Sequence, residues 1–268
     1  MKILGKLVHK DYWNDHLVEI KDNGNYRSLY FASHILQSRM SLASPHRLVL
    51  SYTQYMLLSI LFNPPPKSVL IVGIGSGSFV RFLHHHFPAC KIDAVDYSHH
   101  IIDVARGYFQ LPENENVAVH CLDGFAFLQN NGTIKREKEY DLILVDAFDD
   151  KGMAPTIYSE KFFRLCARSL STKGVVSCNT WSGNKKLLKK IRSILTDSFT
   201  GQIHLPIPGM GNIIVLSMGE EVAWDTICLK KNALKTRTEQ FDLDFKKMVH
   251  IAKQNNLTLA QRIHSVLK

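Results

Sequence analysis

The sequence contains no apolar run long enough to cross a bilayer. Its longest apolar stretches, residues 55–62 and 142–145, fall well below the roughly 20 residues that a membrane-spanning helix needs. Charged residues interrupt positions 1–15, so this segment lacks the apolar core of a secretory signal. We therefore expect a soluble, cytoplasmic protein without a membrane partner.

Cysteine is too scarce and too irregularly placed for a disulfide framework or a zinc motif. The five cysteines include no C-x-x-C pair and stand at positions 90, 121, 166, 178 and 228. We expect buried free thiols in a reducing compartment. The run His84-His85-His86 does not replace such a motif, because adjacent helical residues point about 100° apart. We therefore expect no metal site.

Basic residues outnumber acidic ones, 33 to 24, which gives a net charge of +9. The excess includes lysines at positions 185, 186, 189, 190, 230, 231 and 235. No aromatic residues interleave these lysines as a surface for stacking bases requires. A solvated helix face is the favoured interpretation, and nucleic acid is not an expected partner.

The order of apolar segments divides the 268 residues into three parts. Residues 1–45 alternate like antiparallel strands around the turn signal Asn23-Gly24, which predicts a small β appendage. Residues 46–220 form the predicted catalytic domain, which opens with a helix between Ser44 and Phe62. Residues 221–268 read as C-terminal helices without visible chemistry.

Strand and helix patterns alternate along the central part. Five apolar strands with intervening helices predict a parallel, doubly wound sheet. Two more strand candidates face each other across residues 209–211 and predict an antiparallel pair. The resulting α/β plan of seven mostly parallel strands resembles the Rossmann-like class I methyltransferase fold.

A glycine-rich loop follows the first strand of this sheet. Gly73, Gly75 and Gly77 follow the pattern G-x-G-x-G, with Ser76 between the last two. Glycines at a strand-to-helix turn let the backbone approach a ligand. The third glycine of a dinucleotide fingerprint would fall at Ser78, so this form suits an adenosylmethionine-type ligand better. A plain tight turn is the alternative.

Carboxylates end the next strands. Asp96 follows Gly73 by 23 residues, a spacing that suits two hydrogen bonds to a ribose diol. Asp123-Gly124 ends the third strand and is placed for an adenine amino group, or for an ordinary turn. The fourth strand delivers Asp146 and Asp149, which suit a general base and an anchor for a cationic amine.

These segments resemble the spermidine synthase (polyamine aminopropyltransferase) family over roughly residues 20–220. The resemblance rests on VLIVGIGSGS, CLDGFAFL and DLILVDAFDDKGMAPTIYSEKFFRLCARSL. It implies that Asp146 deprotonates the amine and that Asp149 binds it. It further implies that Asp96 binds the ribose, that Asp123 lies beside the adenine, and that Gln37 contacts the cofactor.

The departures from the family pattern fall on amine recognition. Ser76 stands where the family carries an aspartate, and Tyr52-Thr53-Gln54 replaces a Tyr-His-Glu-like signature. By resemblance, Tyr52 and Gln54 bind the substrate. Trp181 ends the fifth strand and is either a wall of the pocket or a plain core or rim aromatic.

The resemblance implies an aminopropyl transfer from decarboxylated S-adenosylmethionine to an amine such as putrescine, in a homodimer. S-adenosylmethionine itself is the other possible cosubstrate. Two alternatives stay open: a methyltransferase that acts on an unidentified acceptor, and a catalytically silent nucleoside-binding relative.

Overall fold

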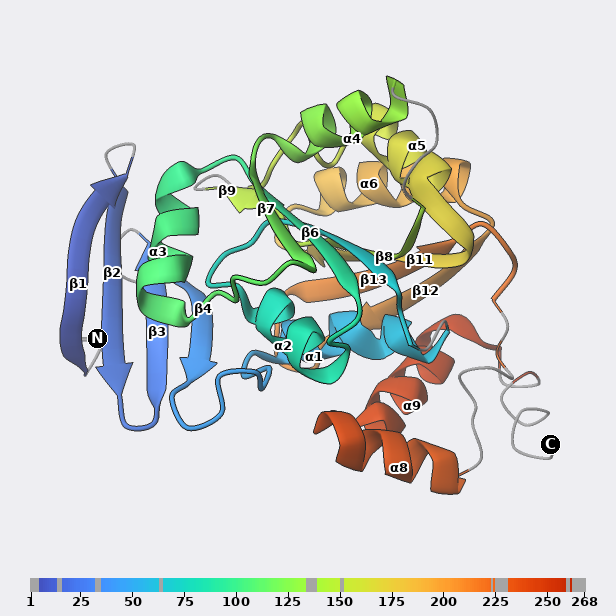
Figure 1. The fold of residues 1–268 in the computed structure, drawn as a ribbon. Coiled ribbons are helices and arrows are strands. Elements are labelled where there is room, and N and C mark those ends of the chain that lie inside the picture. The colour runs from blue at the N-terminus through green and yellow to red at the C-terminus, as the bar shows by residue number, and fades with distance from the viewer. Residues whose placement is uncertain are drawn as a thin grey trace.

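The computed structural model shows an α/β body flanked by a separate antiparallel sheet (Figure 1). It describes residues 5–13, 16–31, 35–62, 65–133, 139–149, 152–222, 224, 231–258 and 261. Cys228, Lys230 and most of the predicted last helix lie outside these residues. No helix in the described ranges combines the length and the apolar character that a bilayer crossing needs.

The main sheet has seven strands in the order β12-β13-β11-β8-β5-β6-β7. Their bounds are Ser68–Val72 (β5), Lys91–Asp96 (β6), Val117–Cys121 (β7), Tyr140–Val145 (β8), Leu170–Trp181 (β11), Gly201–Pro206 (β12) and Asn212–Met218 (β13). The strands β7, β6, β5, β8 and β11 are parallel, whereas β13 is antiparallel to both of its neighbours. The predicted fold class is confirmed, including the final antiparallel pair.

Helices cover both faces of this sheet, and an apolar core lies on each side (Figure 1). One face carries α4 (Gly124–Thr133), α5 (Glu160–Ser169) and α6 (Lys185–Ser198). The other carries α1 (Ser51–Met56), the 3-10 helix η1 (Leu57–Leu61), α2 (Ser78–His86) and α9 (Phe245–Asn256). The central strands are therefore buried on both faces, which explains their continuous apolar sequences.

The N-terminal appendage is a four-stranded antiparallel sheet, β1-β2-β3-β4. Its strands are Lys6–Trp13, His16–Asn23, Tyr26–Phe31 and Ile35–Ser41. The turn predicted at Asn23-Gly24 is present, with Gly24 at φ +56°. The first strand was not expected from the sequence, because its face is largely exposed and lacks a buried apolar stripe. Helix α3 (His99–Phe109) packs between this sheet and the main body.

The helix predicted directly after Ser44 is shorter than expected, because it starts only at Ser51 and tightens into η1 at Leu57. The reason is a tertiary contact: the buried guanidinium of Arg81 donates to the carbonyl of Pro45 at 2.8 Å. The segment before the helix is therefore held in a non-helical path.

The C-terminal segment forms α8 (Lys231–Phe241) and α9 in the described residues. The sequence patterns predicted α9 but not α8, whose surface is mostly polar. Helix α9 packs along the edge strand β12 (Figure 1). The domain boundaries at residues 45 and 220 stay a prediction.

Candidate active site

A cleft of about 950 Å³ opens at the carboxyl ends of the parallel strands, beside the N-terminal sheet. Ligands of doubly wound sheets bind at this edge. Eight of the predicted site residues line it: Gln37, Tyr52, Gly73, Gly75, Asp96, Asp123, Gly124 and Asp146. These predicted residues therefore lie together along one cleft.

The glycine loop lies at the bottom of the cleft. Gly73 has φ +92°, and a Cβ at this position would lie 2.2 Å from the carbonyl oxygen of Asp146. Only glycine allows the loop and the end of β8 to approach so closely. Gly75 also has a positive φ, +53°, but it faces open space where a ligand can pass.

Asp96 connects the glycine loop to the end of β6. One carboxylate oxygen accepts the N–H of Ile74 at 2.9 Å, and the other accepts the N–H of Ser98 at 3.0 Å. Burial raises the pKa of Asp96, although the backbone hydrogen bonds oppose the shift. Its remaining lone pairs suit the hydroxyl donors of a ribose.

Asp123 caps α4, since its Oδ1 accepts the N–H groups of Phe125 and Ala126 at 2.9 and 3.1 Å. The Thr156 hydroxyl donates to the other oxygen at 3.3 Å. Asp123 therefore has a structural role as well as a place in the cleft. Beside it, a Cβ at Gly124 would lie 2.5 Å from Val72, so glycine is needed for close helix-to-sheet packing.

Asp146 is the most perturbed carboxylate of the cleft. Burial raises its pKa from 3.8 to about 6, and hydrogen bonds from Asn179 and Tyr52 only partly oppose this shift. The Asn179 amide donates to Oδ1 of Asp146 at 2.9 Å, and the Asn212 amide donates to Asn179 at 3.0 Å. A carboxylate with such a pKa, held in one orientation, is suited to general-base catalysis.

Two tyrosines surround this carboxylate. Tyr52 lies in the cleft, where burial and the charge of Asp146 raise its pKa. Its hydroxyl hydrogen-bonds to Asp146 and lies 3.5 Å from the carbonyl oxygen of Gln37. Tyr158 is buried and donates to the Asn179 carbonyl at 2.6 Å. Tyr158 therefore supports the strand end that holds Asn179.

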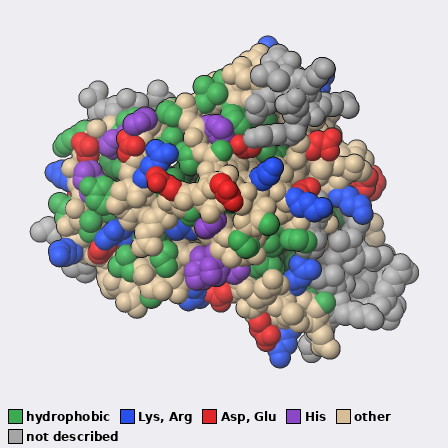
Figure 2. All heavy atoms as spheres, in the orientation of Figure 1, with side chains coloured by type: hydrophobic (Ala, Val, Ile, Leu, Met, Phe, Trp, Pro, Cys, Tyr) green, Lys and Arg blue, Asp and Glu red, His purple; other side chains and the backbone are tan. Residues whose placement is uncertain are grey.

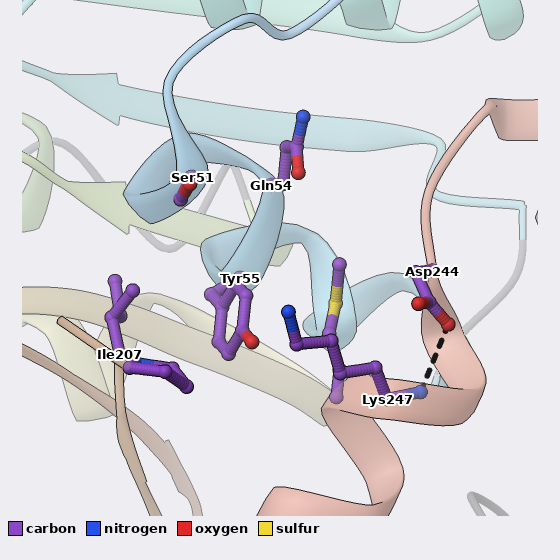
Figure 3. A pocket seen from close by; sticks show the side chains of 8 residues that line it. Ser51, Gln54, Tyr55, Ile207, Asp244 and Lys247 are labelled. Carbon is purple, nitrogen blue, oxygen red and sulfur yellow. Dashed lines mark hydrogen bonds between the residues drawn. The ribbon is translucent and has the colours of Figure 1, made fainter.

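Gln54 lies outside the cleft. It lines a second cavity of about 130 Å³, with Tyr55 from α1 and Asp244 and Lys247 from the start of α9 (Figure 3). Its amide donates to the carbonyl of Leu48 at 2.7 Å. The neighbouring residue, Thr53, lines the cleft instead.

Ser76 and Gly77 also lie outside the cleft lining. The fully buried Ser76 hydroxyl is 2.6 Å from the Ser38 hydroxyl on β4 and so connects the glycine loop to the N-terminal sheet. Gly77 has φ +79° and precedes the first residue of α2. Asp149 ends the short strand β9 (Phe148–Asp149), which pairs with β10 (Gly152–Met153) beside the cleft.

Asn179, Asn212 and Thr156 are site residues that sequence reasoning missed. Asn179 lies inside the buried run of β11, two residues before the strand ends, so a polar residue near a predicted strand end was its available signal. Asn212 and Thr156 carry no such signal, because their contacts with the site come from other elements of the fold.

The strand order, the glycine loop and the carboxylates at successive strand ends define a nucleoside-binding transferase of the class I methyltransferase type. Residues 50–209 match the family model of the spermine/spermidine synthase domain. The chain belongs to the spermine/spermidine synthase family.

Curated relatives agree with this assignment over most of their length. A polyamine aminopropyltransferase of Chromobacterium violaceum is 37% identical over 246 residues, which cover 89% of this chain and 90% of the relative. One of Neisseria meningitidis is 32% identical over 250 residues, which cover 92% and 93%.

Solved structures share the fold. A spermidine synthase in complex with the transition-state analogue AdoDATO superposes with a TM-score of 0.70 at 14% identity, covering 98% of this chain and 89% of that chain. Human methyltransferase-like protein 13 in complex with SAH gives a TM-score of 0.58 at 21% identity, with coverages of 79% and 95%.

Proposed function

We propose that this protein transfers the aminopropyl group of decarboxylated S-adenosylmethionine to a primary amine such as putrescine. The observation that carries the proposal is Asp146, a buried carboxylate with a pKa of about 6, fixed by Asn179 beside the glycine loop. The names of the curated relatives support the same activity.

The nucleoside half of the cleft has the donors and acceptors that the cosubstrate needs. In our proposal Asp96 binds the ribose hydroxyls, Asp123 lies beside the adenine, and Gln37 contacts the cosubstrate from β4. Support comes from their common placement along one cleft. The glycine loop leaves space for the sulfonium nucleoside at Gly75.

The reaction is one displacement. Asp146 accepts a proton from the ammonium form of the acceptor, and the amine nitrogen then attacks the aminopropyl carbon bonded to sulfur. A C–N bond forms as the C–S bond breaks, and the electron pair of the C–S bond stays on sulfur in methylthioadenosine. Asn179 and Tyr52 hold Asp146 in the position from which it can take the proton of the amine that attacks.

The proposal also assigns residues to the acceptor amine. Tyr52 lies beside Asp146 and contacts the reacting amine, and Asp149 anchors the same reacting amine from β9. We also propose that the protein acts in the cytoplasm as a homodimer formed through its N-terminal sheet.

The test is release of methylthioadenosine from decarboxylated S-adenosylmethionine on addition of putrescine, measured by mass spectrometry. Asp146→Asn should lower turnover at least about 100-fold and leave nucleoside affinity, measured by calorimetry, nearly unchanged. Methyl transfer from S-adenosylmethionine without any aminopropyl transfer would instead establish the methyltransferase alternative. Nucleoside binding without turnover of either donor would establish a silent relative.

A further inference from the structure

Trp181 is an exposed aromatic side chain at the rim of the cleft. It is the last residue of β11, and 43% of its surface is exposed although its neighbours along the strand are buried. The side chain lines the cleft together with Met210 from the β12–β13 loop. An exposed indole that faces a ligand cleft is a candidate contact for the ligand.

Two glycines make room for the indole. A Cβ at Gly183 would lie 2.2 Å from Nε1 of Trp181, and a Cβ at Gly211 would lie 2.6 Å from Cη2 at the opposite end of the ring system. Neither glycine has a positive φ, so the backbone conformation does not require glycine at these positions. Glycine is required there because the indole occupies the space that a side chain would need.

The loops that carry these glycines are joined to each other. The N–H of Ser182 donates to the carbonyl of Gly211 at 2.8 Å, and Trp181 pairs with Asn212 across β11 and β13. The indole is therefore held between two loops that the backbone fixes, and its position is set before a ligand binds. A fixed aromatic ring loses little conformational freedom on binding.

Trp181 also lies in register with the proposed base. It follows Asn179 by two residues, so both side chains point to the same face of β11. Asn179 holds Asp146 at 2.9 Å, and the indole therefore begins about 7 Å further along the strand. The two nitrogens of a short alkane diamine are separated by a similar distance.

The charges of the cleft indicate what the indole binds. The carboxylates that line the described part of the cleft are Asp96, Asp123 and Asp146. Asp96 ends β6 and Asp123 follows β7, and both strands lie on the opposite side of β5 from β11, which carries the indole. A second ammonium that extends beyond Asp146 along β11 therefore meets the face of an indole, the strongest aromatic partner for a cation.

We propose that Trp181 is a specificity-determining residue, which binds the distal ammonium and the alkyl chain of a short diamine acceptor by a cation–π contact. The inference rests on the proposed function, because it assigns the acceptor end of the same site. It extends that proposal from any primary amine to a dicationic one.

The test compares Trp181→Phe and Trp181→Leu with putrescine and with n-butylamine, which lacks the distal ammonium. For putrescine, KM should rise in the order Trp, Phe, Leu, by about 2- to 30-fold at leucine, with an unchanged KM for the nucleoside donor. For butylamine, the rise should be clearly smaller. The matched control is Tyr26→Leu, which removes an aromatic ring that is also 43% exposed but lies on the N-terminal sheet. It should leave the KM for putrescine and the KM for butylamine unchanged.

Calorimetric binding of both amines, in the presence of methylthioadenosine, separates this inference from the proposed function. Loss of diamine binding in Trp181→Leu without turnover in the wild type would retain the Trp181 site and reject the transferase. Turnover with equal effects of Trp181→Leu on both amines would retain the transferase and reject the cation–π contact. Absence of diamine binding to the wild-type protein would reject both.

Discussion

Burial raises the pKa of Asp146 from 3.8 to about 6, so the folded protein holds a proton there over a pH range in which the unfolded chain has released it. Protonation therefore favours the folded state below about pH 4, and this contribution is lost as the pH rises through 6. At neutral pH the charged carboxylate destabilises the fold that positions it. The same charge is what lets Asp146 act as a base.

We predict that Asp146→Asn raises the melting temperature at pH 7.5 while it removes activity. The amide keeps an oxygen that accepts the hydrogen bond from Asn179 and carries no charge that must be buried. The gain should shrink at pH 5, where the wild-type carboxyl is mostly protonated. Thermal unfolding at the two pH values checks this, and a gain that grows at pH 5 would contradict it.

A second prediction concerns the glycine loop. Gly73→Ala should unfold or strongly destabilise the protein and abolish nucleoside binding, because its Cβ would meet the backbone of Asp146 at 2.2 Å. Gly75→Ala has a positive φ but open space around it, so it should cost only about 1–2 kcal/mol. Denaturant unfolding of the two variants measures the difference. Equal losses would show that backbone conformation alone governs the loop.

The sequence was most informative about residues whose role follows from their place at a strand end. Asp96, Asp123 and Asp146 were predicted to share a cleft, and they do. Gln54 was expected to bind the substrate but lines a different cavity, because neighbouring positions on a short helix face different sides. Ser76 was expected to face the ligand, whereas its hydroxyl pairs with Ser38, which lies 38 residues earlier.

At the scale of elements, a cluster of His46, His85 and His86 joins α2 to the segment before α1. Histidine side chains form a group on the face of the molecule shown in Figure 2. The His46 and His85 rings stack with centroids 3.7 Å apart, and His86 packs against Phe241 of α8. Burial, followed by the neighbouring histidines, lowers the pKa of His86 from 6.5 to about 4. The charged groups that surround the cluster include the ion pair of Arg47 and Asp242.

The lowered pKa predicts a loss of stability in acid. The unfolded chain takes up protons below pH 6.5 and the folded cluster resists them, so stability should fall between pH 6.5 and about 4. His86→Gln should reduce this fall. His84→Gln, which removes a histidine of the same helix that takes no part in the ring contacts above, is the control. The free energy of unfolding of both variants, measured across this pH range, tests the prediction. An identical pH dependence in the two variants would exclude the cluster as the source of the loss.

The elements themselves were largely predictable, because glycines and aspartates mark the strand ends of the main sheet. The exceptions depend on contacts remote in sequence. The buried Arg81 guanidinium donates to the carbonyls of Pro45 and Phe109 as well as to that of Ser76, and this network delays the start of α1. No local pattern in residues 45–50 reveals that Arg81, 36 residues after Pro45, is the partner.

At the scale of the whole molecule, α9 completes the edge of the main sheet. The side chain of Asn256 accepts the N–H of His204 at 2.8 Å and donates to its carbonyl at 2.9 Å. At His204, this amide side chain thus takes the place of a neighbouring strand on β12, which is the edge strand. The C-terminal helices therefore satisfy backbone groups as well as bury an apolar face.

We predict that Asn256→Ala lowers the free energy of unfolding by about 1–3 kcal/mol, since it leaves two backbone groups of His204 without their partner. The neighbouring Asn255 donates within its own helix, to Ile251, and Asn255→Ala should cost far less. Urea titration of both variants checks the prediction. Equal costs would show that α9 docks through its apolar contacts alone.

The contact between Asn256 and β12 also bears on the behaviour of many copies together. An edge strand with free N–H and C=O groups is a template on which a second chain can add a strand. Loss of the Asn256 clamp would therefore expose each molecule to aggregation, at a rate that depends on protein concentration rather than on catalytic activity. By pairing with β12, α9 protects the protein against aggregation. The active-site cleft lies at another edge of the same sheet.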